Sequence, residues 1–453
     1  MGMFEGLLVF LSILLVYFVS VFILHKKGVL KKYNLTFWGP ALMWRTEKGL
    51  GFLKRIAARK RFWKAFGSSG IILCFIMMIV MMTILVFQAW VVAGFNEEQK
   101  AMMPGPEIAL VLPGINPVLP LEFLGYIVFA LVVAVVVHEF SHGILAFAGK
   151  LKVKSLGVLY LIIPIGAFCE PDEKELRKTS HQKRMRVFAA GPLSNFVVVI
   201  VCIFLFSFVF MSSVQSAEDG VSIFYVLEDS PAEEIGIAQG MIISGINGTT
   251  LKNVSEYLEL LDTTKAGQRI TVSFAQGNEK FTKSVVLADK YNYTENISHM
   301  GVGFLGLGAS QIHSSFLDLL KNPFSNFPDG FTLFYFLPLL GYFQGYNPIV
   351  APFTDSFTVV GPLSFIPSNV FWVVVNTIYW VIWLNLALAL FNVVPMIPLD
   401  GGYMLKDAID LGISRIKKSL SDEKREKIVM NISFAISLVI LFLIIFPWLI
   451  KYI

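Results

Sequence analysis

Residues 120–148 read PLEFLGYIVFALVVAVVVHEFSHGILAFA, and this stretch decides the fold class. Between Leu124 and Val137 it carries no charged side chain, and roughly 20 apolar residues suffice for a helix to cross about 30 Å of hydrocarbon. His138, Glu139 and His142 follow within the same apolar run. Ionisable groups are costly at membrane depth and usually mark function. The stretch therefore predicts a membrane-spanning helix that carries a functional site.

The composition of the whole chain indicates several such helices. The chain has 453 residues, of which 55% are hydrophobic and 15% charged, whereas a soluble protein carries about 25% charged residues. We expect a polytopic α-helical membrane protein in the lipid bilayer, with about six spans. The formal net charge of +5 is better explained as a topology signal than as a nucleic-acid surface, and no nucleic-acid partner is expected. The predicted spans are 4–24, 70–95, 120–148, 186–213, 371–394 and 429–450.

The loops between the spans predict their orientation. Residues 25–69 hold twelve Lys or Arg side chains and one acidic residue, Glu47. Positively charged loops remain on the cytoplasmic side, so this loop is expected to be cytoplasmic. Counting spans then places 149–185 and 403–428 on the cytoplasmic side as well, and 214–370 outside.

The long outer segment has a different character. Residues 216–308 are polar, with alternation typical of strands at 270–274 and 281–285 and a turn signal at Asn247-Gly248. We expect a small soluble domain here. Residues 309–370 are rich in Phe, Pro and Gly, and we expect a re-entrant or interfacial connector. The predicted organisation is 1–119 (two spans with a basic loop), 120–213 (first part of the core), 216–308 (outer domain), 309–370 (connector) and 371–453 (second part of the core and last span).

The pair His138 and His142 predicts a metal site. Residues four apart lie on one face of a helix, so both imidazoles can bind the same ion. The H-E-x-x-H spacing is typical of zinc hydrolases, in which a glutamate takes a proton from water whose pKa zinc lowers to about 7. A chance match is the alternative, but Glu and His are strongly disfavoured in an apolar span. The three cysteines lack paired spacing and indicate neither disulfides nor a thiolate site.

Asp400 is a candidate third ligand, because zinc in hydrolases takes three protein ligands. It follows the uncharged run 371–399, whose prolines near the end break the helix, and it precedes Gly401-Gly402. The alternative is an N-cap for the next helix. The predicted topology puts Asp400 and the two histidines in the inner part of their spans, so they can share one depth. Two roles for Asn195 are compatible with the sequence. It binds a substrate carbonyl or oxyanion, or it makes an interhelical hydrogen bond.

Taken in order, these motifs resemble the site-2 protease family of intramembrane zinc metalloproteases. The resemblance implies one Zn²⁺ per chain, bound by His138, His142 and Asp400, with Glu139 as general base. It also implies that Asn195 and Asn392 help to hold the substrate strand, and that the run near 156–170 is a membrane-associated β-hairpin. The matching stretches are His138–His142, Gly166–Glu173, Arg186–Asn195 and Asn392–Gly402.

The outer domain resembles a bacterial-type PDZ module, through residues 230–240 and 242–248. We therefore expect a small α+β PDZ-like domain inserted into the membrane protein. Met241 stands where an acid is usual, and the residues that would hold a peptide are not predicted. Two roles remain open: capture of a peptide or of a substrate ectodomain by strand addition, and steric filtering of substrates by size.

The function implied is hydrolysis of a peptide bond in or near the transmembrane helix of a single-span membrane protein, as in regulated intramembrane proteolysis. The alternative is a non-proteolytic scaffold or peptide-binding protein that works through the PDZ-like domain. A transporter is a weaker alternative, because no inverted repeat is visible. The lack of a Cys-rich luminal insert favours a multi-pass protein of a prokaryotic plasma membrane, an archaeal one included. Its active site would face the cytoplasm and its PDZ-like domain the outside.

Overall fold

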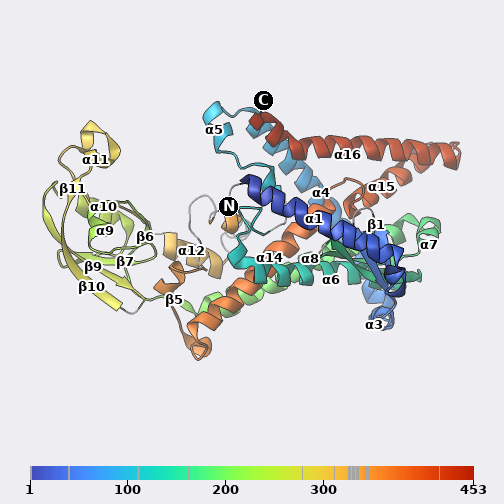
Figure 1. Cartoon of the computed structure of the whole chain (residues 1–453), viewed down its shortest axis with the longest axis horizontal. Helices are drawn as coiled ribbons and strands as arrows, with labels where there is room; N and C mark the ends of the chain where they lie inside the picture. The colour runs from blue at the N-terminus through green and yellow to red at the C-terminus, as the bar shows by residue number, and fades with distance from the viewer. Residues whose placement is uncertain are drawn as a thin grey trace. The chain divides into compact units, whose positions relative to one another are not determined.

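The computed structural model describes residues 3–38, 41–109, 113–161, 163–277, 279–310, 312–324, 328, 332, 336–339, 341, 347, 349–417 and 419–452 (Figure 1). The chain forms two compact units, and the division between them cuts through three long helices. The first unit comprises residues 1–106, 130–199 and 384–453, and the second comprises 107–129 and 200–383.

Five helices within the described residues are long and apolar enough to cross a membrane. They are Lys60–Ala93 (α4), Leu121–Ala148 (the turn η2, Leu121–Phe123, and α6, Leu124–Ala148), His181–Ser213 (α8, His181–Phe204, and the turns η3, Leu205–Phe210, and η4, Met211–Ser213), Ser368–Val393 (α14) and Asp422–Tyr452 (α16). They coincide with five of the six expected spans. The sixth, 4–24, falls in α1 (Met3–Lys26), whose described apolar part is the shorter stretch Leu15–Lys26, and it stays a prediction.

Helix α4 has the character of a lipid-facing span within the first unit. Ile72, Ile79 and Trp90 are 64%, 68% and 72% exposed, as expected of side chains that meet lipid rather than water. On its other side, a Cβ added to Gly70 would lie 3.0 Å from a methyl carbon of Leu193 on α8. Small residues at such points let membrane helices approach closely. Helix α16 packs against α4 and against α15 (Asp400–Ile416).

The first unit also contains a four-stranded antiparallel sheet in the order β1-β2-β3-β4. The hairpin expected near 156–170 is formed by β3 (Val153–Leu161) and β4 (Ile163–Pro171). Sequence analysis missed the other two strands, β1 (Leu35–Trp38) and β2 (Ala41–Thr46), because they lie inside the basic loop. Strand β4 lies at one edge of this sheet. The short helices of the unit are α2 (Val29–Lys32), α3 (Leu50–Ile56), α5 (Glu97–Met102), η1 (Pro106–Ala109, partly in the second unit) and α7 (Glu173–Lys178).

The second unit holds the inserted PDZ-like domain. Its sheet has the order β10-β9-β7-β6-β13, with β8 paired to β7, and the strands curve around two helices (Figure 1). The expected Asn247-Gly248 turn joins β7 to β8, and both residues have positive φ, 51° and 78°, as a tight hairpin requires. The strands are β6 (Val221–Val226), β7 (Ile242–Ile246), β8 (Thr249–Thr250), β9 (Arg269–Gln276), β10 (Glu279–Val286) and β13 (Leu307–Ser310), and the helices are α9 (Pro231–Glu234) and α10 (Val254–Asp262).

This domain has its own apolar core. Ile223, Val272 and Phe274 from the strands pack with Tyr257 and Leu261 of α10, and all five side chains are buried. Smaller elements follow β10: the pair β11 (Ala288–Asp289) and β12 (Gly303–Phe304), α11 (Tyr291–Thr294) and η5 (Ile297–His299). The last strand, β13, ends two residues beyond the expected boundary at 308.

The two ends of the insertion meet in a short ribbon. Strand β5 (Val214–Ser216) pairs with β14 (Phe357–Val359), and the N–H of Val360 donates to the carbonyl oxygen of Ser213 at 2.7 Å. Of the expected connector 309–370, the described parts include α12 (Ile312–Lys321), η6 (Phe353–Ser356) and η7 (Gly361–Leu363). Much of 325–348 lies outside the described residues, so the predicted re-entrant segment stays a prediction.

Candidate active site

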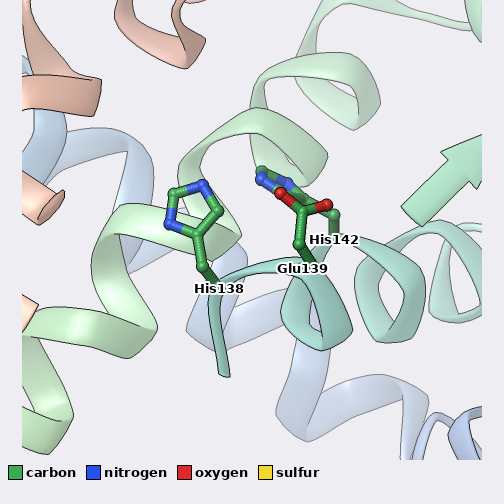
Figure 2. Close-up of side chains that lie close together, drawn as sticks. All are labelled: His138, Glu139 and His142. Carbon is green, nitrogen blue, oxygen red and sulfur yellow. The ribbon is translucent and has the colours of Figure 1, made fainter. Parts of the chain in front are cut away.

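Helix α6 presents three potential ligand side chains close together. His138, Glu139 and His142 each offer a ligand atom, and these atoms lie within 4.8 Å of one another. Figure 2 shows the three side chains side by side on α6. Both histidines are buried, and their ring centroids are 4.8 Å apart. The one-turn spacing that the sequence predicts thus brings both imidazoles to one place.

Asp400, the first residue of α15, meets both imidazoles. Its Oδ2 lies 3.1 Å from Nε2 of His138 and 3.3 Å from Nε2 of His142. Two ligand atoms that are each about 2 Å from a tetrahedral zinc ion lie about 3.3 Å apart. The separations and the N, N, O donor set therefore fit zinc.

Two glycines allow Asp400 to reach this position. A Cβ added to Gly401 would lie 2.3 Å from the carbonyl oxygen of Val393, and one added to Gly402 would lie 2.4 Å from the carbonyl carbon of Met396. Helix α15 therefore begins directly against the backbone that ends α14. Only residues without a side chain fit there.

A third glycine lies close against the Nε2 atoms of both imidazoles. A Cβ added to Gly191 of α8 would lie 2.5 Å from Nε2 of His138 and 2.6 Å from Nε2 of His142. Gly191 lies in the matching stretch Arg186–Asn195, but the sequence predicts no role for it. Its role depends on how α8 packs against α6.

Backbone groups orient the side chains of His142 and Glu139. The Nδ1–H of His142 donates to the carbonyl oxygen of Val187 at 2.7 Å, because a carbonyl can only accept. The proton is thus held on Nδ1, and Nε2 keeps the lone pair that a metal requires. Glu139 accepts a hydrogen bond at Oε2 from the N–H of Cys169 on β4, at 2.7 Å. The sequence predicts neither partner, because any residue type can supply a backbone N–H or carbonyl group.

The strand that holds Glu139 is itself fixed by charged and polar groups. Glu170 accepts from Nε of Arg45 at 3.1 Å and from Oγ of Ser155 at 2.9 Å. Partial burial acts to raise the pKa of the Glu170 carboxyl, but the hydrogen bonds from Ser155 and Arg45 and the arginine charge lower it, and the pKa is held below its ordinary value. These contacts join β2, β3 and β4.

The two asparagines of the sequence prediction have different surroundings. Asn195 is fully buried on α8, and neither its Oδ1 nor its Nδ2 has a hydrogen-bond partner among the described residues. An unpaired amide is costly in a closed interior. Asn392 is half-buried and donates from Nδ2 to the carbonyl oxygen of Leu388 in its own helix, at 3.0 Å. It is the second-to-last residue of α14 and so lies directly before the loop that leads to Asp400.

Apolar spanning helices and a His-Glu-His group facing a carboxylate define a membrane metalloprotease. The chain belongs to peptidase family M50, whose sequence model matches residues 126–440. It is 25% identical over 414 residues to an uncharacterized protein of Methanocaldococcus jannaschii, with 90% of each chain covered. It is also 27% identical over 337 residues to a Clostridium perfringens protein that is provisionally named a zinc metalloprotease, with 64% of this chain and 89% of that one covered.

The inserted domain is similar to two solved PDZ domains of SdrC-like proteins. The one from Listeria monocytogenes is 20% identical and covers 21% of this chain and 92% of its own, with a TM-score of 0.18. The one from Listeria innocua is 25% identical and covers 20% and 93%, with the same TM-score of 0.18. A score this low carries no argument, so the description of the domain as PDZ-like rests on its own strands and helices.

Proposed function

We propose that this protein is an intramembrane zinc endopeptidase of the site-2 type. In this proposal it cleaves a peptide bond in or near the transmembrane helix of a single-span membrane protein. One Zn²⁺ per chain is held by His138, His142 and Asp400. The convergence of two imidazole Nε2 atoms and one carboxylate oxygen within 3.1 and 3.3 Å is the observation that carries the proposal.

Glu139 is the general base in this proposal. The bound zinc supplies a Lewis acid that lowers the pKa of water and polarises the scissile carbonyl. Cys169 holds Oε2 of Glu139 at 2.7 Å, and we assign Oε1 to take the proton from water and to return it to the leaving amine. Because Nδ1–H of His142 donates to the Val187 carbonyl, the histidine stays in the tautomer whose Nε2 can bind metal.

The substrate must present an extended segment to these groups, since a helix shields its own peptide bonds. Strand β4 lies at the sheet edge, and the contact from Cys169 to Glu139 lies on it. A substrate strand that pairs with β4 would bring its backbone next to the base. The unpaired amide of Asn195 is assigned to the substrate carbonyl or the developing oxyanion, and Asn392 to the substrate strand.

The PDZ-like domain is assigned a second function, the selection of substrates outside the membrane. Strand β13 lies at an edge of its sheet, where an extended peptide could be added. The basic loop 25–69 supports a cytoplasmic position for the metal site and an outer position for this domain. Relatives from prokaryotes support a plasma membrane location.

The test is cleavage of a tagged single-span substrate in membranes by the wild type and by Glu139→Gln, each with and without a zinc chelator. We expect product from the wild type with zinc alone, and zinc bound but no product in Glu139→Gln. Cleavage that survives Glu139→Gln would refute the role of base. Inert behaviour of all samples across several substrates would favour the scaffold alternative.

A further inference from the structure

Helices α8 and α15 are joined by side-chain contacts. Arg184 pairs with Asp407, with Nε of the arginine 3.0 Å from both carboxylate oxygens. One helical turn further along, Phe188 stacks on Tyr403, with ring centroids 5.0 Å apart and an interplanar angle of 17°. The metal site lies beyond this stack, where Gly191 of α8 and Asp400 of α15 both approach the Nε2 atoms of the two imidazoles on α6.

The spacing of these contacts is the same on both helices. Arg184 and Gly191 are seven residues apart on α8, and Asp400 and Asp407 are seven apart on α15. Seven residues are about two turns, or roughly 10 Å along a helix, so the contacts on each helix share one face. The helices run in opposite directions along this face, and the arginine pair is the contact farthest from the metal site.

The Arg184–Asp407 pair joins a buried aspartate to a partly buried arginine, and both make further contacts. Asp407 is 5% exposed. Arg184 also donates from Nη1 to the carbonyl oxygens of Arg177 and Thr179, at 3.0 and 3.2 Å, which ties it to the end of α7. Asp407 lies 3.4 Å from Nδ1 of His181 as well. Buried ion pairs are weak evidence for stability, and their best-attested role is to fix the register of packed helices.

We propose that Arg184 and Asp407 are positioning residues that set the register of α15 on α8 and so place the carboxylate of Asp400 against the two imidazoles. The inference rests on the proposed metal site. A slip of one residue would turn α15 by about 100° and move it 1.5 Å, whereas metal–ligand distances tolerate about 0.2 Å. Gly401 and Gly402 fix the start of α15 against the end of α14. The ion pair fixes the position of α15 two turns later.

The test is zinc affinity of the full-length protein in detergent, measured by competition with a chromophoric chelator, beside the thermal stability of the metal-free form. Asp407→Asn is expected to raise the zinc Kd about 10-fold to 100-fold, the effect of losing a group that orients a ligand. Arg186→Gln is the matched control, because this arginine of α8 donates to Ser68 on α4 rather than to a residue of α15. We expect its zinc Kd to equal that of the wild type.

Two double variants separate positioning from stability. The reversed pair Arg184→Asp with Asp407→Arg should recover much of both zinc affinity and stability. The apolar pair Arg184→Met with Asp407→Leu should recover stability but leave zinc binding weakened, because it lacks a directional contact. Wild-type affinity in Asp407→Asn, or full recovery of zinc binding by the apolar pair, would overturn the inference. The proposed function predicts that the wild type binds one zinc and that His138→Ala does not. If the wild type bound no zinc, or if His138→Ala kept it, the proposed function itself would be refuted.

Discussion

Replacing Gly191 with alanine tests the site through a single methyl group. The added Cβ would lie 2.5 Å from Nε2 and 2.6 Å from Cε1 of His138, and 2.6 Å from Nε2 of His142. Ordinary contacts of this kind begin at 3.4 Å, so the imidazoles and α8 must separate by about 0.9 Å. That displacement is several times the roughly 0.2 Å that metal–ligand distances tolerate.

We expect Gly191→Ala to lose most of its zinc affinity and at least about 100-fold in cleavage rate, which is about 2.7 kcal/mol of transition-state stabilisation. The helix itself should not suffer, since alanine is favoured over glycine in a helix interior by about 1 kcal/mol. The assays are zinc content per chain after dialysis against a weak chelator, and initial cleavage rate. Gly412→Ala is the matched control, because a Cβ there meets no atom within 4 Å. If Gly191→Ala kept one tightly bound zinc and the wild-type rate, the packing argument would be wrong.

Three further predictions concern other parts of the chain. Gly402→Ala should lower both zinc content and thermal stability, because its Cβ would lie 2.4 Å from a backbone carbon of Met396. Backbone atoms move less easily than a side chain does. An unchanged melting temperature would contradict this prediction. Glu170→Gln should destabilise the protein by under about 1 kcal/mol at pH 7, since the pair is partly exposed. The Glu170 pKa is lowered in the fold, so its contribution is fully present above the ordinary value of about 4.3 and is lost as the pH falls through the lowered pKa. The difference in melting temperature between variant and wild type should therefore shrink as the pH is lowered, and a constant difference would argue against the ion pair. Phe274→Ala should lower the free energy of unfolding of the PDZ-like domain by about 3–5 kcal/mol, because this side chain is 2% exposed and stacks on Phe281. Limited proteolysis of the full chain should show faster cleavage of this variant. Val286→Ala, at an exposed position, should be cleaved like the wild type.

Local patterns in the sequence anticipated the elements whose cause is local. Uncharged apolar runs predicted five helices, because only a helix satisfies its backbone in lipid. The Asn247-Gly248 dipeptide predicted its hairpin, because both residues tolerate positive φ. The i, i+4 spacing predicted that His138 and His142 share a face. Asp400 could be proposed as their neighbour because topology put it at the same depth.

Features that depend on distant packing could not be predicted in this way. Strands β1 and β2 were hidden because the lysines and arginines around them dominate the composition of the loop. The partners of Glu139 and His142 are backbone atoms of Cys169 and Val187, and any residue supplies those. Arg184 and Asp407 are more than 200 residues apart, so their pairing is decided by how two helices meet. Each of these contacts becomes visible only in three dimensions.

The ribbon of β5 and β14 has a consequence for how this protein can change over evolution. Ser213 and Val360, at the two ends of the insertion, are joined by a hydrogen bond of 2.7 Å. Everything between them therefore leaves and re-enters at a single point, and a short turn would bridge the same gap. A domain of another kind could be inserted at the same point, with the spacing of the flanking helix ends preserved. Substrate choice and peptide-bond chemistry could then diverge independently in related chains.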